Sequence, residues 1–178
     1  MIPAGIRIGE VEFFWDGPDG FYMIEGDKVP VEQMPRDIRD FVDQHINARH
    51  QEALTEMGIS SPELRRLKFL QCNCSSYDFT PDLEDGVMQL EYVACEYRGS
   101  CKQEGKLCQP LMINGQKISM QELRITSLIR KGLYDKEISA VLNIAPQTLR
   151  THKQNIERKL NADRKVQVAL KAVEYGII

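Results

Sequence analysis

The stretch that decides the fold reads Asp135-Lys-Glu-Ile-Ser-Ala-Val-Leu142, then Asn143-Ile-Ala-Pro146, then Gln147-Thr-Leu-Arg-Thr-His-Lys-Gln-Asn-Ile-Glu-Arg-Lys-Leu160. Apolar residues recur in the first and last segments at the spacing of one helical face. The middle segment interrupts that pattern, and its proline suits the first turn of a new helix. Two helices joined by a short turn, the second rich in basic and amide side chains, are typical of a helix-turn-helix that binds DNA.

Helical patterns flank this pair on both sides. One covers residues 121–131 and is closed by Gly132, and the other covers residues 164–175. Residues 118–178 are therefore predicted to form an all-α domain of four helices. This segment carries 11 Lys and Arg against 6 Asp and Glu, whereas residues 1–117 carry 12 against 20. The charge difference indicates that only the C-terminal segment meets a polyanion.

The same segment resembles the LuxR (GerE) helix-turn-helix domain, without gaps, over residues 118–178. The positions that agree are Ile118-Ser119, Gly132-Leu133, Lys136-Glu137-Ile138, Leu142, Ile144, Thr148, His152, Asn155-Ile156, Lys159-Leu160, Gln167 and Gly176-Ile-Ile178. The sequence departs from the family at Met120–Arg124, Thr126, Ala145-Pro146 and Asn161. The resemblance implies that the third helix enters the major groove of DNA and that the fourth, Arg164–Tyr175, mediates dimerisation.

Carried over by position, Arg150, Thr151 and Gln154 are expected to contact base edges. Their spacing agrees, because it gathers three side chains on one side of a helix. Arg suits guanine, Gln suits adenine, and Thr offers a hydroxyl or a methyl contact. Other side chains are expected to contact phosphates, which position a protein without reading sequence. They are Lys136, Thr148, Lys153, Arg158 and Lys159.

The N-terminal part is predicted to be a small module of a β-hairpin or three-stranded meander with helices. Residues 10–15, 21–24 and 29–31 favour strands and are separated by turn residues. A helical pattern runs from Pro35 to about Met57, and a shorter one from Pro62 to about Phe69. The fold class of the whole chain is therefore α+β.

A cysteine-rich loop segment completes this module. Its thiols are Cys72, Cys74, Cys95, Cys101 and Cys108. Because the segment has few apolar side chains, four converging thiolates on a structural zinc ion would supply the missing stability. The best set of four ligands is Cys95, Cys101 and Cys108 together with either Cys72 or Cys74. An iron–sulfur cluster and five unligated thiols stay open as alternatives.

These patterns divide the chain into a cysteine-rich module at 1–111, a linker at 112–117 and a DNA-binding domain at 118–178. They predict a sequence-specific transcription regulator that binds double-stranded DNA as a homodimer and holds zinc in its N-terminal module. That acidic module is also a candidate surface for a protein partner. A metal- or redox-sensing regulator and a DNA-processing accessory factor are the alternatives.

An enzyme is not expected, because the sequence contains no glycine-rich phosphate loop, H-E-x-x-H or G-x-S-x-G motif. It also contains no apolar run near the roughly 20 residues that a membrane-spanning helix needs. The first residues lack a basic stretch followed by an apolar one, so no secretory signal is expected. A cytoplasmic location follows as an expectation.

Overall fold

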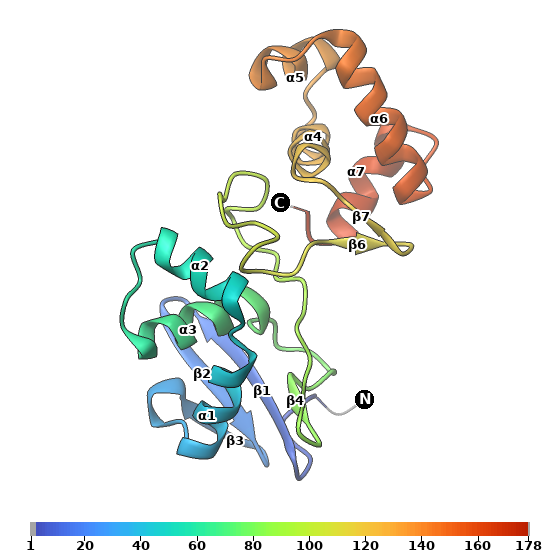
Figure 1. Ribbon diagram of the computed structural model, residues 1–178. Coiled ribbons are helices and arrows are strands. Elements are labelled where there is room, and N and C mark those ends of the chain that lie inside the picture. The colour runs from blue at the N-terminus through green and yellow to red at the C-terminus, as the bar shows by residue number, and fades with distance from the viewer. Residues whose placement is uncertain (1–2, 178) are drawn as a thin grey trace. The chain divides into compact units, whose positions relative to one another are not determined.

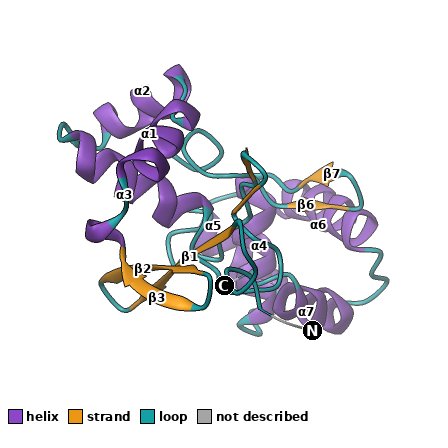
Figure 2. Ribbon diagram, turned by 90° about the horizontal axis from the view of Figure 1, so that it is seen from below, coloured by secondary structure: helices purple, strands orange, loops and turns teal. Residues whose placement is uncertain are grey.

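The computed structural model describes residues 3–177, which form two compact units. The first contains the chain up to Val93 together with Gly105–Gln109, and the second contains Ala94–Glu104 and the chain from Pro110 onward. An antiparallel sheet with helices in the first unit and a helical second unit confirm the predicted α+β class (Figures 1 and 2). The predicted domain boundaries stay a prediction.

The first unit is built on a five-stranded antiparallel sheet of order β3-β2-β1-β4-β5. Its strands are β1 (Glu10–Asp16), β2 (Asp19–Ile24), β3 (Asp27–Pro30), β4 (Leu83–Glu84) and β5 (Val87–Met88). The register places Phe13 opposite Tyr22, and both side chains are buried. The predicted meander is therefore present, and a second short hairpin extends it.

Three α-helices and a short 3-10 turn accompany this sheet. They are η1 (Val31–Gln33), α1 (Arg36–His45), α2 (Ala48–Glu56) and α3 (Pro62–Asn73). The shared core contains Val11, Phe13, Tyr22, Val31, Met34, Ile38, Val42, Ile46, Ala53, Leu54, Phe69, Leu70, Cys74 and Leu107. Burial of these side chains supplies most of the stabilisation of the unit.

The prediction of one helix from Pro35 to Met57 is wrong, because the chain breaks between His45 and Ala48. Asn47 caps α2: its side-chain oxygen accepts a hydrogen bond from the His50 backbone N–H at 3.1 Å. The Asn47 N–H in turn donates to Nδ1 of His50 at 3.3 Å. Asn47 satisfies free amides at the start of α2, so a new helix begins here. Its extended backbone interrupts the helical path, although apolar residues continue at helical spacing on both sides.

The second unit contains a small hairpin and four helices. They are β6 (Met112–Ile113), β7 (Gln116–Lys117), α4 (Met120–Arg130), α5 (Asp135–Leu142), α6 (Pro146–Leu160) and α7 (Lys165–Glu174). The four predicted helices are confirmed to within one or two residues. Buried side chains join them: Leu123, Ile125, Ile129, Ile138, Leu149, Ile156, Leu160, Val168 and Ala172. No helix within residues 3–177 has both the length and the apolar character to cross a bilayer.

The segment Ala94–Glu104 packs in this second unit through polar contacts. Arg98 and Glu104 form an ion pair at 3.7 Å, with side chains only 3% and 7% exposed. The Glu104 carboxylate also accepts the Gly99 N–H at 2.6 Å, and Arg124 of α4 donates to the Gly99 carbonyl. A Cβ at Gly99 would lie 2.9 Å from the Arg124 side chain, and the φ of +80° favours glycine. Charged side chains thus hold a segment that is poor in apolar residues.

Candidate nucleic-acid interface

The turn between α5 and α6 is short because both helix ends are fixed locally. Asn143 ends α5 in the left-handed conformation, which asparagine tolerates better than most residues. Pro146 begins α6 at the first helical position, where its missing N–H leaves no intrahelical bond unmade. Three residues, 143–145, therefore join the two helices, as a helix-turn-helix requires.

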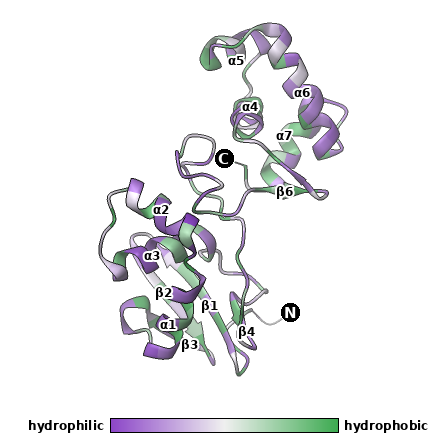
Figure 3. Ribbon diagram, viewed as in Figure 1, coloured by the Kyte–Doolittle hydropathy of each residue, from purple (hydrophilic) through white to green (hydrophobic). Residues whose placement is uncertain are grey.

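Helix α6 has one buried face and one exposed face. Leu149, Ile156 and Leu160 are at most 1% exposed and pack into the core of the unit. The predicted base-contacting side chains, Arg150, Thr151 and Gln154, are all exposed. In Figure 3, much of the α6 ribbon has the colour of hydrophilic residues. The base contacts of Arg150, Thr151 and Gln154 remain a prediction. Because the three side chains are exposed, a DNA duplex can reach them.

Thr151 differs from the other two members of this set. Its hydroxyl donates a hydrogen bond to the backbone carbonyl of Gln147 at 3.2 Å. The hydroxyl proton is therefore used within the helix. The hydroxyl oxygen can still accept a hydrogen bond, and the side-chain methyl group can still make an apolar contact.

The side chains predicted to contact phosphates lie in different settings. Lys136 and Thr148 are exposed, and Arg158 is exposed while donating to the Gln116 side chain at 3.0 Å. Lys153 is in an ion pair with Asp135 at 2.8 Å. Lys159 is in an ion pair with Glu122 at 2.7 Å and also donates to the Lys117 carbonyl at 2.8 Å. Lys136, Thr148 and Arg158 are thus the most accessible to a phosphate, whereas the contacts of Lys159 within the domain favour a structural role.

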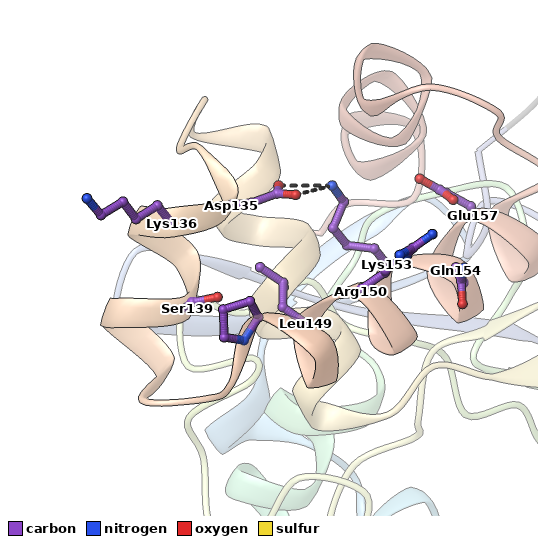
Figure 4. A pocket seen from close by; sticks show the side chains of 9 residues that line it. Asp135, Lys136, Ser139, Leu149, Arg150, Lys153, Gln154 and Glu157 are labelled. Carbon is purple, nitrogen blue, oxygen red and sulfur yellow. Dashed lines mark hydrogen bonds and ion pairs between the residues drawn. The ribbon is translucent and has the colours of Figure 1, made fainter.

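A groove of about 570 Å³ runs between α5 and one flank of α6. It is lined by Asp135, Lys136, Ser139, Pro146, Leu149, Arg150, Lys153, Gln154 and Glu157. Figure 4 shows the Lys153 side chain extending toward the Asp135 carboxylate. Two acidic residues therefore share a surface that the sequence pattern marks as basic, and sequence reasoning missed both. Asp135 and Lys153 lie 18 positions apart, so no helical spacing relates them.

The segment that forms this surface matches a known family. Residues 116–172 match the family model of bacterial regulatory proteins, luxR family. This segment is a LuxR-type helix-turn-helix domain. Comparisons of the chain with curated proteins and with solved structures gave no match. The chain therefore carries the DNA-binding domain of a transcription regulator, and the match covers about a third of its length.

The predicted metal ligands are distributed over both compact units. Cys72, Cys74 and Cys108 belong to the first unit, and Cys95 and Cys101 belong to the second, which also contains the LuxR-type domain. Cys74 is fully buried in the core of the first unit, and burial raises the pKa of its thiol. Among residues 3–177, no three Cys, His, Asp or Glu side chains are grouped as a metal site would need. Zinc or iron–sulfur binding stays a prediction from cysteine spacing.

Proposed function

We propose that this protein is a sequence-specific transcription regulator whose α6 reads base edges in the major groove of double-stranded DNA. The observation that carries the proposal is the exposed row of Arg150, Thr151 and Gln154 on α6, the third helix of a LuxR-type domain. Arginine recognises the two acceptors of guanine, and glutamine recognises adenine through two hydrogen bonds. The family supports a regulator rather than an enzyme, and a cytoplasmic location is part of the proposal.

Arg150→Ala tests this reading directly. We expect it to weaken binding to the preferred duplex by about 5- to 150-fold, the equivalent of about 1–3 kcal/mol for one bidentate base contact. Sequence preference at one base pair should relax as well. The preferred duplex is first selected from randomised DNA with the full chain, and affinities are then measured by fluorescence anisotropy.

Lys136→Ala is the matched control, because it removes an exposed cation from the same groove without removing a predicted base contact. It should weaken binding to all duplexes alike and reduce the salt dependence. Equal losses for Arg150→Ala on the selected and on random duplexes would overturn the assignment of a base-reading role.

The proposal includes a homodimer on DNA formed through α7. Val166, Leu170 and Val173 are all exposed on this helix, at a spacing of four and three residues. That spacing places them on one face, where large apolar side chains without a covering partner mark an interaction surface. A second copy of the same face fits it, because an isologous contact joins identical patches.

Leu170→Glu is expected to abolish this dimer, because it places two charges within an apolar contact. Sedimentation of the full chain with a duplex that contains two half-sites should then show one protein copy bound where the unmodified chain shows two. Gln167→Glu, at an exposed position of the same helix, controls for the added charge, because its side-chain oxygen accepts the Asp163 N–H at 2.7 Å and a glutamate keeps that acceptor. Two bound copies of the Leu170 variant would contradict the dimer surface.

The acidic N-terminal module is proposed as the surface through which a protein partner acts on the regulator. The excess of Asp and Glu over Lys and Arg in residues 1–117 supports this role, because it disfavours contact with DNA. For the metal-sensing alternative, no three Cys, His, Asp or Glu side chains among the described residues are grouped so that they could hold a metal ion. The redox-sensing and DNA-processing alternatives stay hypotheses.

A further inference from the structure

The groove beside α6 contains an acidic side chain that is paired with one of the predicted phosphate contacts. Both carboxylate oxygens of Asp135, the first residue of α5, accept hydrogen bonds from the Lys153 ammonium, at 2.8 and 2.9 Å. The Asp135 side chain is 58% exposed and that of Lys153 is 21% exposed. Figure 4 shows the two side chains meeting across the groove. The ammonium is thus held toward α5.

The position of Lys153 on α6 gives this pair its significance for DNA binding. Lys153 lies on the flank of the exposed face, next to Arg150 and Gln154 in the same groove. A lysine at the edge of a base-reading surface faces the phosphate backbone, where it adds affinity for every sequence. Asp135 removes that contribution as long as its carboxylate holds the ammonium in the ion pair.

We propose that Asp135 is a specificity-determining residue: its ion pair with Lys153 withholds that ammonium from the phosphates of sequences that α6 does not recognise. This inference rests on the proposed function, because it assumes that α6 meets duplex DNA. It assigns Asp135 no base contact, and it makes the pair a means of lowering sequence-independent affinity.

The strength of the pair permits a partner exchange at a recognised site. A half-exposed ion pair contributes only about 0–1 kcal/mol, so a nearby phosphate can replace the carboxylate. At a recognised sequence, base contacts of Arg150 and Gln154 hold α6 close to the backbone and favour that exchange. On a random sequence those contacts are missing, and the ammonium stays with Asp135. The difference in binding free energy between the recognised and the random sequence, which is the specificity, then becomes larger.

The test uses the full chain with the selected duplex and a random duplex of equal length, over a series of salt concentrations. D135N keeps the shape of the side chain and removes its charge. We expect D135N to bind the random duplex about three- to tenfold more tightly and the selected duplex less than about twofold more tightly. On the random duplex, the slope of log K against log salt should steepen by about 0.9, the value for one added phosphate contact.

Two further variants separate the pair from general charge repulsion. In a K153Q background, D135N should leave the affinity for the random duplex unchanged, because no ammonium is left to release. E157Q is the matched control: Glu157 lines the same groove, and among the described residues its carboxylate forms no ion pair. Its effect should be the same with and without K153Q.

The outcomes distinguish the inference from the function on which it rests. A D135N effect that persists in the K153Q background, or an equal effect on both duplexes, would overturn the role of the pair. So would unchanged affinity for the random duplex. In each case, preference for the selected duplex by the unmodified chain leaves the proposed function standing. Failure of the unmodified chain to bind any duplex would instead overturn the proposed function. Thermal unfolding of each variant confirms that affinities are compared between folded proteins.

Discussion

Replacing Lys159 with methionine is expected to lower the free energy of unfolding of the LuxR-type domain by about 3 kcal/mol, because it leaves a buried carboxylate without its partner. The Lys159 ammonium lies 2.7 Å from the Glu122 carboxylate, and the two side chains are 15% and 4% exposed. Methionine matches the length and apolar stem of lysine, so packing changes little. The stability loss therefore reports the charge that remains on Glu122.

Glu122 also fixes the start of α4. Its carboxylate accepts the Ser119 N–H at 2.7 Å, while the Ser119 hydroxyl accepts the Glu122 N–H at 3.3 Å. Burial acts to raise the pKa of Glu122, but the Lys159 and Ser119 hydrogen bonds outweigh it and hold the pKa below its ordinary value. A lowered folded pKa stabilises the domain above the unfolded pKa of about 4.3, and this stabilisation is lost as pH falls through the folded pKa.

Urea unfolding of the full chain, followed by circular dichroism at 222 nm, measures the Lys159→Met effect. Lys136→Met is the control, since Lys136 is exposed on α5 of the same domain. Adding Glu122→Gln to Lys159→Met should restore part of the lost stability, because it removes the unpaired charge. A Lys159→Met chain as stable as the unmodified one, but with weaker binding to all duplexes, would return Lys159 to the phosphate contacts.

How much of this domain a sequence can predict depends on how far apart the interacting residues lie. The faces of α6 follow from local periodicity, so the buried Leu149, Ile156 and Leu160 and the exposed Arg150 were predictable. The partners of Lys153 and Lys159 were not, because they lie 18 and 37 positions away on other helices. Basic residues that look alike in sequence therefore divide into exposed and internally paired ones only in the folded domain.

The N-terminal module shows two other limits. Asn47 is a local signal for the start of α2. The sequence analysis still predicted one continuous helix, because apolar residues recur at helical spacing on both sides of Asn47. The cysteine segment had no such signal. Its scarcity of apolar residues favoured a metal, which stays a prediction, and sequence reasoning missed the buried ion pair of Arg98 and Glu104 within the same segment. Sequence cannot show that two charges six residues apart will be buried together, because their burial depends on the packing of the whole unit.

A group of buried carboxylates in the first unit leads to the second large expected effect. Glu12 of β1 accepts the N–H groups of Asp78 and Asp82, at 2.9 and 3.2 Å. The Asp82 carboxylate accepts the Phe13 N–H at 2.8 Å. Burial raises the pKa of Asp82 to about 9, helped by the nearby Glu12, and burial raises the pKa of Glu12 to about 7. Both groups thus hold protons in the folded unit at pH values where the unfolded chain has released them.

The sign of the pH dependence follows from these raised values. Below the unfolded pKa of about 4, both states are protonated and the groups contribute no difference. Between that value and the folded pKa, the unfolded state binds fewer protons, so stability falls as pH rises. The slope is at most about 1.4 kcal/mol per pH unit for each group. The first unit should therefore lose stability from pH 5 to pH 9, through Glu12 up to about 7 and through Asp82 up to about 9.

Asp82→Asn is expected to flatten this profile and to stabilise the first unit above pH 7. An asparagine keeps an oxygen for the Phe13 N–H and, like the protonated acid, carries no charge in the buried site. Urea unfolding at pH 5, 7 and 9, followed by the fluorescence of Trp15 in β1, reports on this unit. Asp19→Asn, at an exposed position of β2, should leave the slope unchanged. Parallel profiles for the unmodified chain and Asp82→Asn would show that Asp82 is ionised in the folded unit and that its burial does not govern the pH response.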